Sequence, residues 1–113
     1  MKVVFIHGKD ADPSAKSWYV WLKNELDKRK IKSFFPQLPN SVDPDVGEWI
    51  CEIENLNPDE ETILIGHSRG GMAILRWLEE APKNKKVGKV ILIAANNPGV
   101  DEKNQKKRHK RIL

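Results

Sequence analysis

Residues 62–71 read TILIGHSRGG, and this stretch decides the fold. Its first five residues form a short apolar run typical of a buried strand, and residues 69–80 (RGGMAILRWLEE) carry apolar side chains at helical spacing. Between the two stands Ser68, in a Gly-x-Ser-x-Gly pattern with Gly66 and Gly70. The stretch therefore predicts a strand, a tight turn and a helix, with Ser68 at the turn.

This turn has the chemistry of a nucleophile. A serine held away from the sheet exposes its Oγ, and we expect side chains at Gly66 or Gly70 to collide with the neighbouring helix and strand. The N–H of Arg69 would lie at a helix N-terminus, where a developing oxyanion is favoured. The pattern thus predicts Ser68 as a nucleophile and Arg69 as an oxyanion-hole donor.

Two other interpretations of the glycines are a turn that only permits close helix packing and a phosphate-binding loop. A P-loop requires G-x-x-x-x-G-K-[ST] and a dinucleotide fold requires G-x-G-x-x-G, and the sequence contains neither. Neither alternative accounts for the serine. We expect no cofactor and no metal. The single cysteine, Cys51, excludes a cysteine-clustered zinc site and falls on a helix as an inert side chain.

The rest of the chain alternates strands with helices. Strands are expected at residues 2–6, 31–35, 62–66 and 89–95, and helices at 18–30, from about 44 to 57, and at 69–80. Parallel strands joined by helical crossovers give the α/β class, here a three-layer open sheet of four mainly parallel strands with helices on both faces. Asp43 is the expected N-cap of the second helix, ahead of Pro44. Positions expected to face inward are Met72, Leu75 and Leu78, and core or interface positions are Trp18, Trp21, Trp49 and Trp77.

The first strand ends in His7-Gly8, and the second oxyanion donor of such a site comes from the loop that follows this strand. The N–H groups of Lys9 and Asp10 are the candidates, and Lys9 is taken as the donor. We expect His7 to bond to the loop backbone, and His67 to be a packing residue inside the turn.

Length and composition fit one folded domain without a membrane span. The chain has 113 residues, 39% of them hydrophobic, and its longest apolar run, Val90–Ala95, is too short to cross a bilayer. We therefore expect a soluble, cytoplasmic protein with a core at residues 1–100. Residues 101–113 form a basic tail with six Lys/Arg against two Asp/Glu and no aromatic side chain, so nucleic-acid binding is not expected.

Together, KVVFIHG, GEWICEI, TILIGHSRGG and KVILIAA resemble the amino-terminal half of the α/β-hydrolase superfamily. The resemblance covers about residues 2–95 and is specifically to small serine hydrolases of the retinoblastoma-binding-protein-9 and YdeN type. It implies that the sheet order is second, first, third, fourth strand, and that a ligand site lies between the first and third strands. It also implies a carboxylesterase-like hydrolase with a small ester or acyl substrate.

Members of this superfamily continue through two further strands, whose loops supply an acid and then a histidine. In this chain only Asp101 and His109 follow Ser68 in that order, with no strand between them. The resemblance therefore leaves two interpretations open: a hydrolase with impaired activity, and an inactive remnant that serves as a binding module. We also expect residues 89–95 to form an apolar sheet edge that pairs with a second copy or with a complementing C-terminal half.

Overall fold

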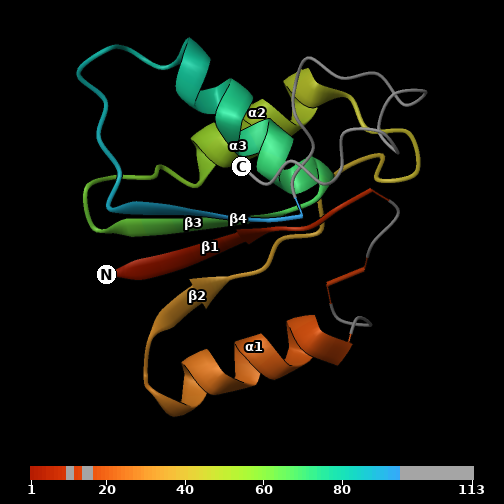
Figure 1. The fold of residues 1–113 in the computed structure, drawn as a ribbon, viewed down its shortest axis with the longest axis vertical. Coiled ribbons are helices and arrows are strands. Elements are labelled where there is room, and N and C mark those ends of the chain that lie inside the picture. The colour runs from red at the N-terminus through yellow and green to blue at the C-terminus, as the bar shows by residue number, and fades with distance from the viewer. Residues whose placement is uncertain (10–11, 14–16, 95–113) are drawn as a thin grey trace.

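The computed structural model describes residues 1–9, 12–13 and 17–94, which alternate strands and helices throughout (Figure 1). The strands are β1 (Lys2–Ile6), β2 (Lys32–Phe34), β3 (Thr62–His67) and β4 (Lys89–Ile93). The helices are α1 (Ser17–Lys28), α2 (Val46–Asn55) and α3 (Arg69–Glu80). The predicted order of elements is confirmed, and most boundaries differ by one or two residues.

The strands form one parallel sheet in the order β2-β1-β3-β4, as the resemblance implied. Helix α1 covers one face of the sheet, and α2 and α3 cover the other (Figure 1). The chain leaves β1 towards β2 on one side and reaches β3 on the other, so the carboxyl ends of β1 and β3 flank a topological switch point. The three-layer α/β fold is therefore confirmed.

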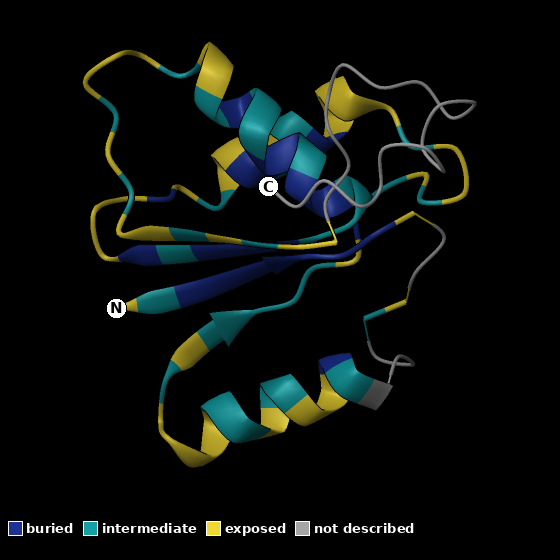
Figure 2. Cartoon of the chain, viewed as in Figure 1, coloured by how far each residue is buried: buried dark blue, intermediate teal, exposed yellow. Residues whose placement is uncertain are grey.

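The main core lies between the sheet and the α2–α3 layer, where the buried residues gather (Figure 2). It consists of Val4, Ile6, Leu38, Trp49, Ile53, Leu64, Ala73, Ile74 and Trp77. A smaller aromatic cluster joins α1 to the opposite face, centred on Phe5 and Tyr19. Phe5 stacks on Phe35 with ring centroids 5.0 Å apart. The face under α2 and α3 is thus packed by a mixed aliphatic and aromatic core, and the face under α1 by an aromatic cluster.

The predicted N-cap of α2 is wrong. Asp45, not Asp43, caps the helix, because its carboxylate accepts the N–H of Gly47 at 2.8 Å and that of Glu48 at 3.3 Å. Pro44 consequently precedes the cap instead of opening the helix. Either aspartate of the Asp-Pro-Asp sequence could start a helix, and only the position of α2 in the fold selects the second.

The predicted inner faces of two helices also need correction. In α3 the buried side chains are Ala73, Ile74 and Trp77, whereas the three side chains expected inward, Met72, Leu75 and Leu78, are only half-buried. Trp21 is 61% exposed, so it is not a core residue, and packing in an interface is the part of its prediction that stands. Helix α1 contacts the sheet through Tyr19, and the side chain two positions further on points away from it.

Candidate active site

Ser68 lies between the end of β3 and the start of α3 in a conformation that few non-glycine residues adopt. Its φ is 54° and its ψ is −120°. The Ser68 N–H donates to the carbonyl of Ile93 at 2.9 Å, and the Ser68 carbonyl accepts the N–H of Gly71 at 3.0 Å. A backbone strained by about 1–3 kcal/mol persists only where neighbours impose it, and here β4 and α3 hold both backbone groups of the serine.

The two glycines around Ser68 let α3 start directly against the sheet. A Cβ on Gly66 would lie 2.5 Å from the Cα of Gly71, and a Cβ on Gly70 would overlap the carbonyl oxygen of Ile6. Both obstacles are backbone atoms, which cannot rotate aside as a side chain can. The first turn of α3 is therefore seated on the carboxyl ends of β1 and β3.

The loop after β1 lies against the same turn. A Cβ on Gly8 would come within 3.1 Å of the Cβ of Ser68. Lys9 follows in an exposed turn, and Asp10, the other candidate donor, lies outside the described residues. The structure thus brings together three of the predicted parts: Ser68, the first turn of α3 that begins with Arg69, and the loop that carries Lys9.

His7 bonds to the loop backbone, as the sequence predicts, and the bonds fix its tautomer. Its Nε2 accepts the N–H of Leu38 at 2.9 Å, so the ring proton resides on Nδ1 and is donated to the carbonyl of Gly8 at 2.7 Å. That carbonyl belongs to the same planar trans peptide as the N–H of Lys9, and the two groups point in opposite directions. By holding the Gly8 carbonyl, His7 sets the direction of the Lys9 N–H.

His7 also makes the stability of the fold depend on pH. Burial lowers the pKa of its imidazole below the usual 6.5, against the opposing effects of the Gly8 hydrogen bond and of Asp12. Below about pH 6.5 the unfolded chain therefore binds this proton more readily than the folded chain, and the folded state loses stability as the pH falls. We expect the free energy of unfolding, measured in urea, to be lower near pH 5 than near pH 7.5. In a His7→Asn variant, the free energy of unfolding should fall less between pH 7.5 and pH 5 than in the wild type. An unchanged pH dependence would contradict the assignment of this effect to His7.

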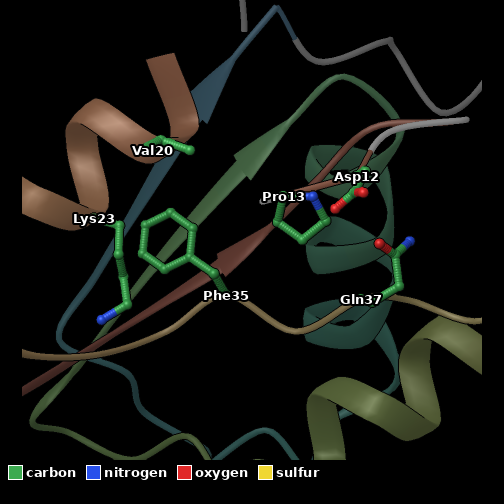
Figure 3. A pocket seen from close by; sticks show the side chains of 6 residues that line it. All are labelled: Asp12, Pro13, Val20, Lys23, Phe35 and Gln37. Atoms are coloured by element: carbon green, nitrogen blue, oxygen red, sulfur yellow. The ribbon is translucent and has the colours of Figure 1, made fainter. Parts of the chain in front are cut away.

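Two cavities open near the carboxyl edge of the sheet, on opposite faces. The cavity beside the Ser68 turn has a volume of about 220 Å³ and is lined by Pro44, Val46, Trp49, Arg69, Met72 and Ala73. The cavity on the α1 face has a volume of about 430 Å³ and is lined by Asp12, Pro13, Val20, Lys23, Phe35 and Gln37 (Figure 3). A third cavity, of about 480 Å³, lies along the loop before α2 and the first turn of that helix. Among these three cavities, all lined by described residues, the one beside the Ser68 turn borders a predicted site residue, Arg69, and its lining is mostly apolar.

The remaining candidate residues from the sequence lie on the surface or outside the described residues. Cys51 is exposed on α2. Asp101, His109 and the basic tail lie outside the described residues, as does the end of the predicted fourth strand. Within the part of the chain that the structure describes, no cluster of His, Cys, Asp or Glu could hold a metal ion, and no helix is long and apolar enough to span a membrane. Sequence reasoning missed Tyr19, whose hydroxyl reaches Gly8 and His67, because only the fold brings these residues together.

Residues 3–112 match the family model described as "Serine hydrolase". The chain belongs to the serine hydrolase family. It is 33% identical over 95 residues to the putative hydrolase YdeN of Bacillus subtilis. That alignment covers 82% of this chain and 50% of YdeN. It is also 30% identical over 110 residues to the serine hydrolase RBBP9 of Rattus norvegicus, in an alignment that covers 93% of this chain and 56% of RBBP9.

Solved structures agree with this assignment. The crystal structure of the Bacillus subtilis ydeN gene product superimposes with a TM-score of 0.74 at 30% identity, over 83% of this chain and 51% of that one. An extracellular α/β-hydrolase from a Paenibacillus species gives a TM-score of 0.66 at 18% identity, over 97% of this chain and 50% of that one, which shows the shared fold. The chain therefore has an α/β-hydrolase fold and spans about half the length of the relatives it matches.

Proposed function

We propose that this chain carries the nucleophile and the oxyanion hole of a serine hydrolase, with Ser68 as the nucleophile. The observation that carries the proposal is the strained backbone of Ser68 at the start of α3, with the loop after β1 packed against its side chain. Membership in the serine hydrolase family supports the same assignment. The position matches the strand-to-helix turn on which such hydrolases present their serine.

The proposed reaction is acyl transfer from a small ester to the serine. The Oγ of Ser68 forms a bond to the carbonyl carbon, and the carbonyl electron pair moves onto its oxygen. The N–H groups of Arg69 and Lys9 stabilise this oxyanion. When the carbonyl re-forms, the bond to the alkoxy group breaks, the serine proton goes to the leaving alcohol, and the acyl group stays on Ser68 until water removes it.

We place the acyl group in the cavity of about 220 Å³ beside Arg69. Ligand pockets usually measure about 300–1,000 Å³, so this one suits a short acyl chain, and its apolar wall favours an alkyl group over a charged one. Trp49 from α2 and Met72 from α3 both contribute to this wall.

Shortening Met72 is expected to change the preferred acyl length. A Met72→Ala variant enlarges the cavity, and we expect the rate of Ser68 acylation by p-nitrophenyl octanoate, relative to the acetate, to rise roughly 10-fold. The rates are measured by mass spectrometry of the acylated chain. Leu75→Ala, a truncation on the same helix outside the cavity lining, should leave the ratio unchanged. An equal change in both variants would contradict this location of the acyl group.

The acid and the histidine that complete such a site are proposed to come from a segment that pairs with the edge of β4. Among the described residues, β4 pairs only with β3, and Ile91 and Ile93 on it are 39% and 37% exposed. A second copy of the chain or a complementing C-terminal half would cover them. Analytical ultracentrifugation tests the first of these, and a monomer at high concentration would rule it out.

A fluorophosphonate probe tests the proposed function. It forms a covalent bond with a nucleophilic serine. We expect the oxyanion-hole N–H groups to support slow labelling of the folded chain, which is lost in the Ser68→Ala variant. Ser41→Ala is the matched control, because Ser41 lies in the loop before α2 and should not affect labelling. Folded wild-type chain that resists labelling would favour the alternative of an inactive binding module.

A further inference from the structure

A single buried hydroxyl connects the two chain segments that flank Ser68. Tyr19 of α1 is 0% exposed, and its hydroxyl lies 2.7 Å from Nδ1 of His67 and 3.4 Å from the backbone nitrogen of Gly8. His67 ends β3, and Gly8 begins the loop after β1. Helix α1 covers the face of the sheet opposite α3 (Figure 1), so this contact reaches the site from the far side.

The direction of these hydrogen bonds follows from counting protons. The Gly8 N–H can only donate, so the phenol oxygen accepts there. The phenol has one proton, which leaves Nδ1 of His67 as its acceptor and places the proton of the neutral His67 ring on Nε2. Burial raises the pKa of Tyr19, which keeps the phenol protonated as this arrangement requires.

Each partner of Tyr19 directly precedes a group of the proposed site. His67 precedes Ser68, and Gly8 precedes Lys9. The two segments are in close contact, because a Cβ on Gly8 would lie 3.5 Å from His67 Nδ1 and 3.1 Å from the Cβ of Ser68. The Gly8 N–H already donates to Tyr19, so among the described residues of this loop Lys9 is the next one whose N–H can face an oxyanion.

Aromatic packing holds the Tyr19 ring independently of its hydroxyl. The ring centroid lies 4.6 Å from that of Phe5 and 4.5 Å from that of Trp18, both in edge-to-face geometry. The His67 ring also meets Trp18 edge-on, at 5.1 Å. Removing the hydroxyl alone should therefore leave the ring in place and release only the two hydrogen bonds.

We propose that Tyr19 is a positioning residue, whose hydroxyl ties the loop after β1 to the Ser68 turn and so fixes the distance between the Ser68 Oγ and the Lys9 N–H. The proposal rests on the proposed function for its catalytic consequence, and on the hydrogen bonds alone for the tie itself. It assigns His67 the role of hydrogen-bond acceptor in this tie, beyond the packing expected from the sequence.

The test compares Tyr19→Phe with Thr62→Val. Thr62 is a matched control, because its buried hydroxyl is hydrogen-bonded to Asp59 at the other end of β3, away from Ser68. We expect Tyr19→Phe to slow fluorophosphonate labelling of Ser68 by roughly 10-fold, since small displacements of a catalytic donor are costly. Thr62→Val should label at the wild-type rate. Nitrogen-15 NMR of the folded proteins provides a second readout that does not depend on reactivity.

In the NMR spectra the wild type should show the Nε2–H tautomer of His67. In Tyr19→Phe the Nδ1 resonance of His67 and the amide proton of Gly8 should both move towards values without a hydrogen bond. If neither signal responds, the tie does not exist and the proposal is overturned. If the signals respond but labelling is as fast as in Thr62→Val, the tie has no positioning role. A wild type that shows these signals but cannot be labelled contradicts the proposed function and leaves the tie in place.

Discussion

Replacing Gly70 by alanine is expected to destabilise the fold by more than about 3 kcal/mol. The new Cβ would overlap the carbonyl oxygen of Ile6 and press on that of His7, and both belong to the strand-end backbone on which α3 is seated. Relief requires α3 to move away from β1, which opens the main core. Because domains of this size are stable by about 5–15 kcal/mol, urea unfolding should show a large fall in the midpoint.

Gly47→Ala is the control for this prediction. Gly47 also lies in the first turn of a helix, but the nearest obstacle to its Cβ is the exposed side chain of Asp45, at 3.2 Å. That side chain can shift, and alanine favours a helix more than glycine does, so we expect a change of less than about 1 kcal/mol. Equal effects of the two substitutions would show that helix α3 is not seated on β1 as described.

Trp49→Ala is expected to cost about 3–5 kcal/mol in the free energy of unfolding. Trp49 is 1% exposed in the main core, and its indole N–H donates to the carbonyl of Pro39 at 2.7 Å. Its ring also meets His7 edge-on, with centroids 5.4 Å apart. The truncation removes a large apolar group and leaves the half-buried Pro39 carbonyl without its donor. Thermal or urea unfolding monitored by far-UV circular dichroism measures the loss.

Trp21→Ala offers the comparison within the same chain. It deletes the same side chain from another helix, but at a position that is 61% exposed. We expect a change within about 0.5 kcal/mol, as for most surface substitutions. A large loss in this variant would mean that Trp21 is buried in an interface that the chain forms in solution.

The sequence predicts those parts of the fold that depend on local patterns of apolar residues and glycines. Strand β3 and helix α3 are visible in residues 62–80, because a short apolar run gives way to helical spacing at a glycine-rich turn. The steric need for Gly70 is predictable for the same reason, since a tight turn against a sheet leaves no room for a side chain. The alternation of elements then fixes the α/β class.

The parts that the sequence does not predict depend on how the elements are oriented. Trp21 and Trp49 both occupy apolar helical spacings, and only the packed fold shows that one faces solvent and the other the core. The choice of Asp45 as N-cap depends in the same way on where α2 meets its neighbours. The hydrogen bond between Tyr19 of α1 and His67 at the end of β3 joins residues 48 positions apart in the sequence. No local pattern predicts such a contact.

The fold is proposed to hold the Ser68 hydroxyl at a strained turn beside N–H groups that stabilise an oxyanion, so labelling of this serine should require the folded chain. The most direct test is to locate the fluorophosphonate adduct by tandem mass spectrometry across a urea titration. We predict an adduct on Ser68 whose yield falls in step with the loss of circular dichroism as the chain unfolds. An adduct on another residue, or one on Ser68 that forms equally well in the unfolded chain, would contradict it.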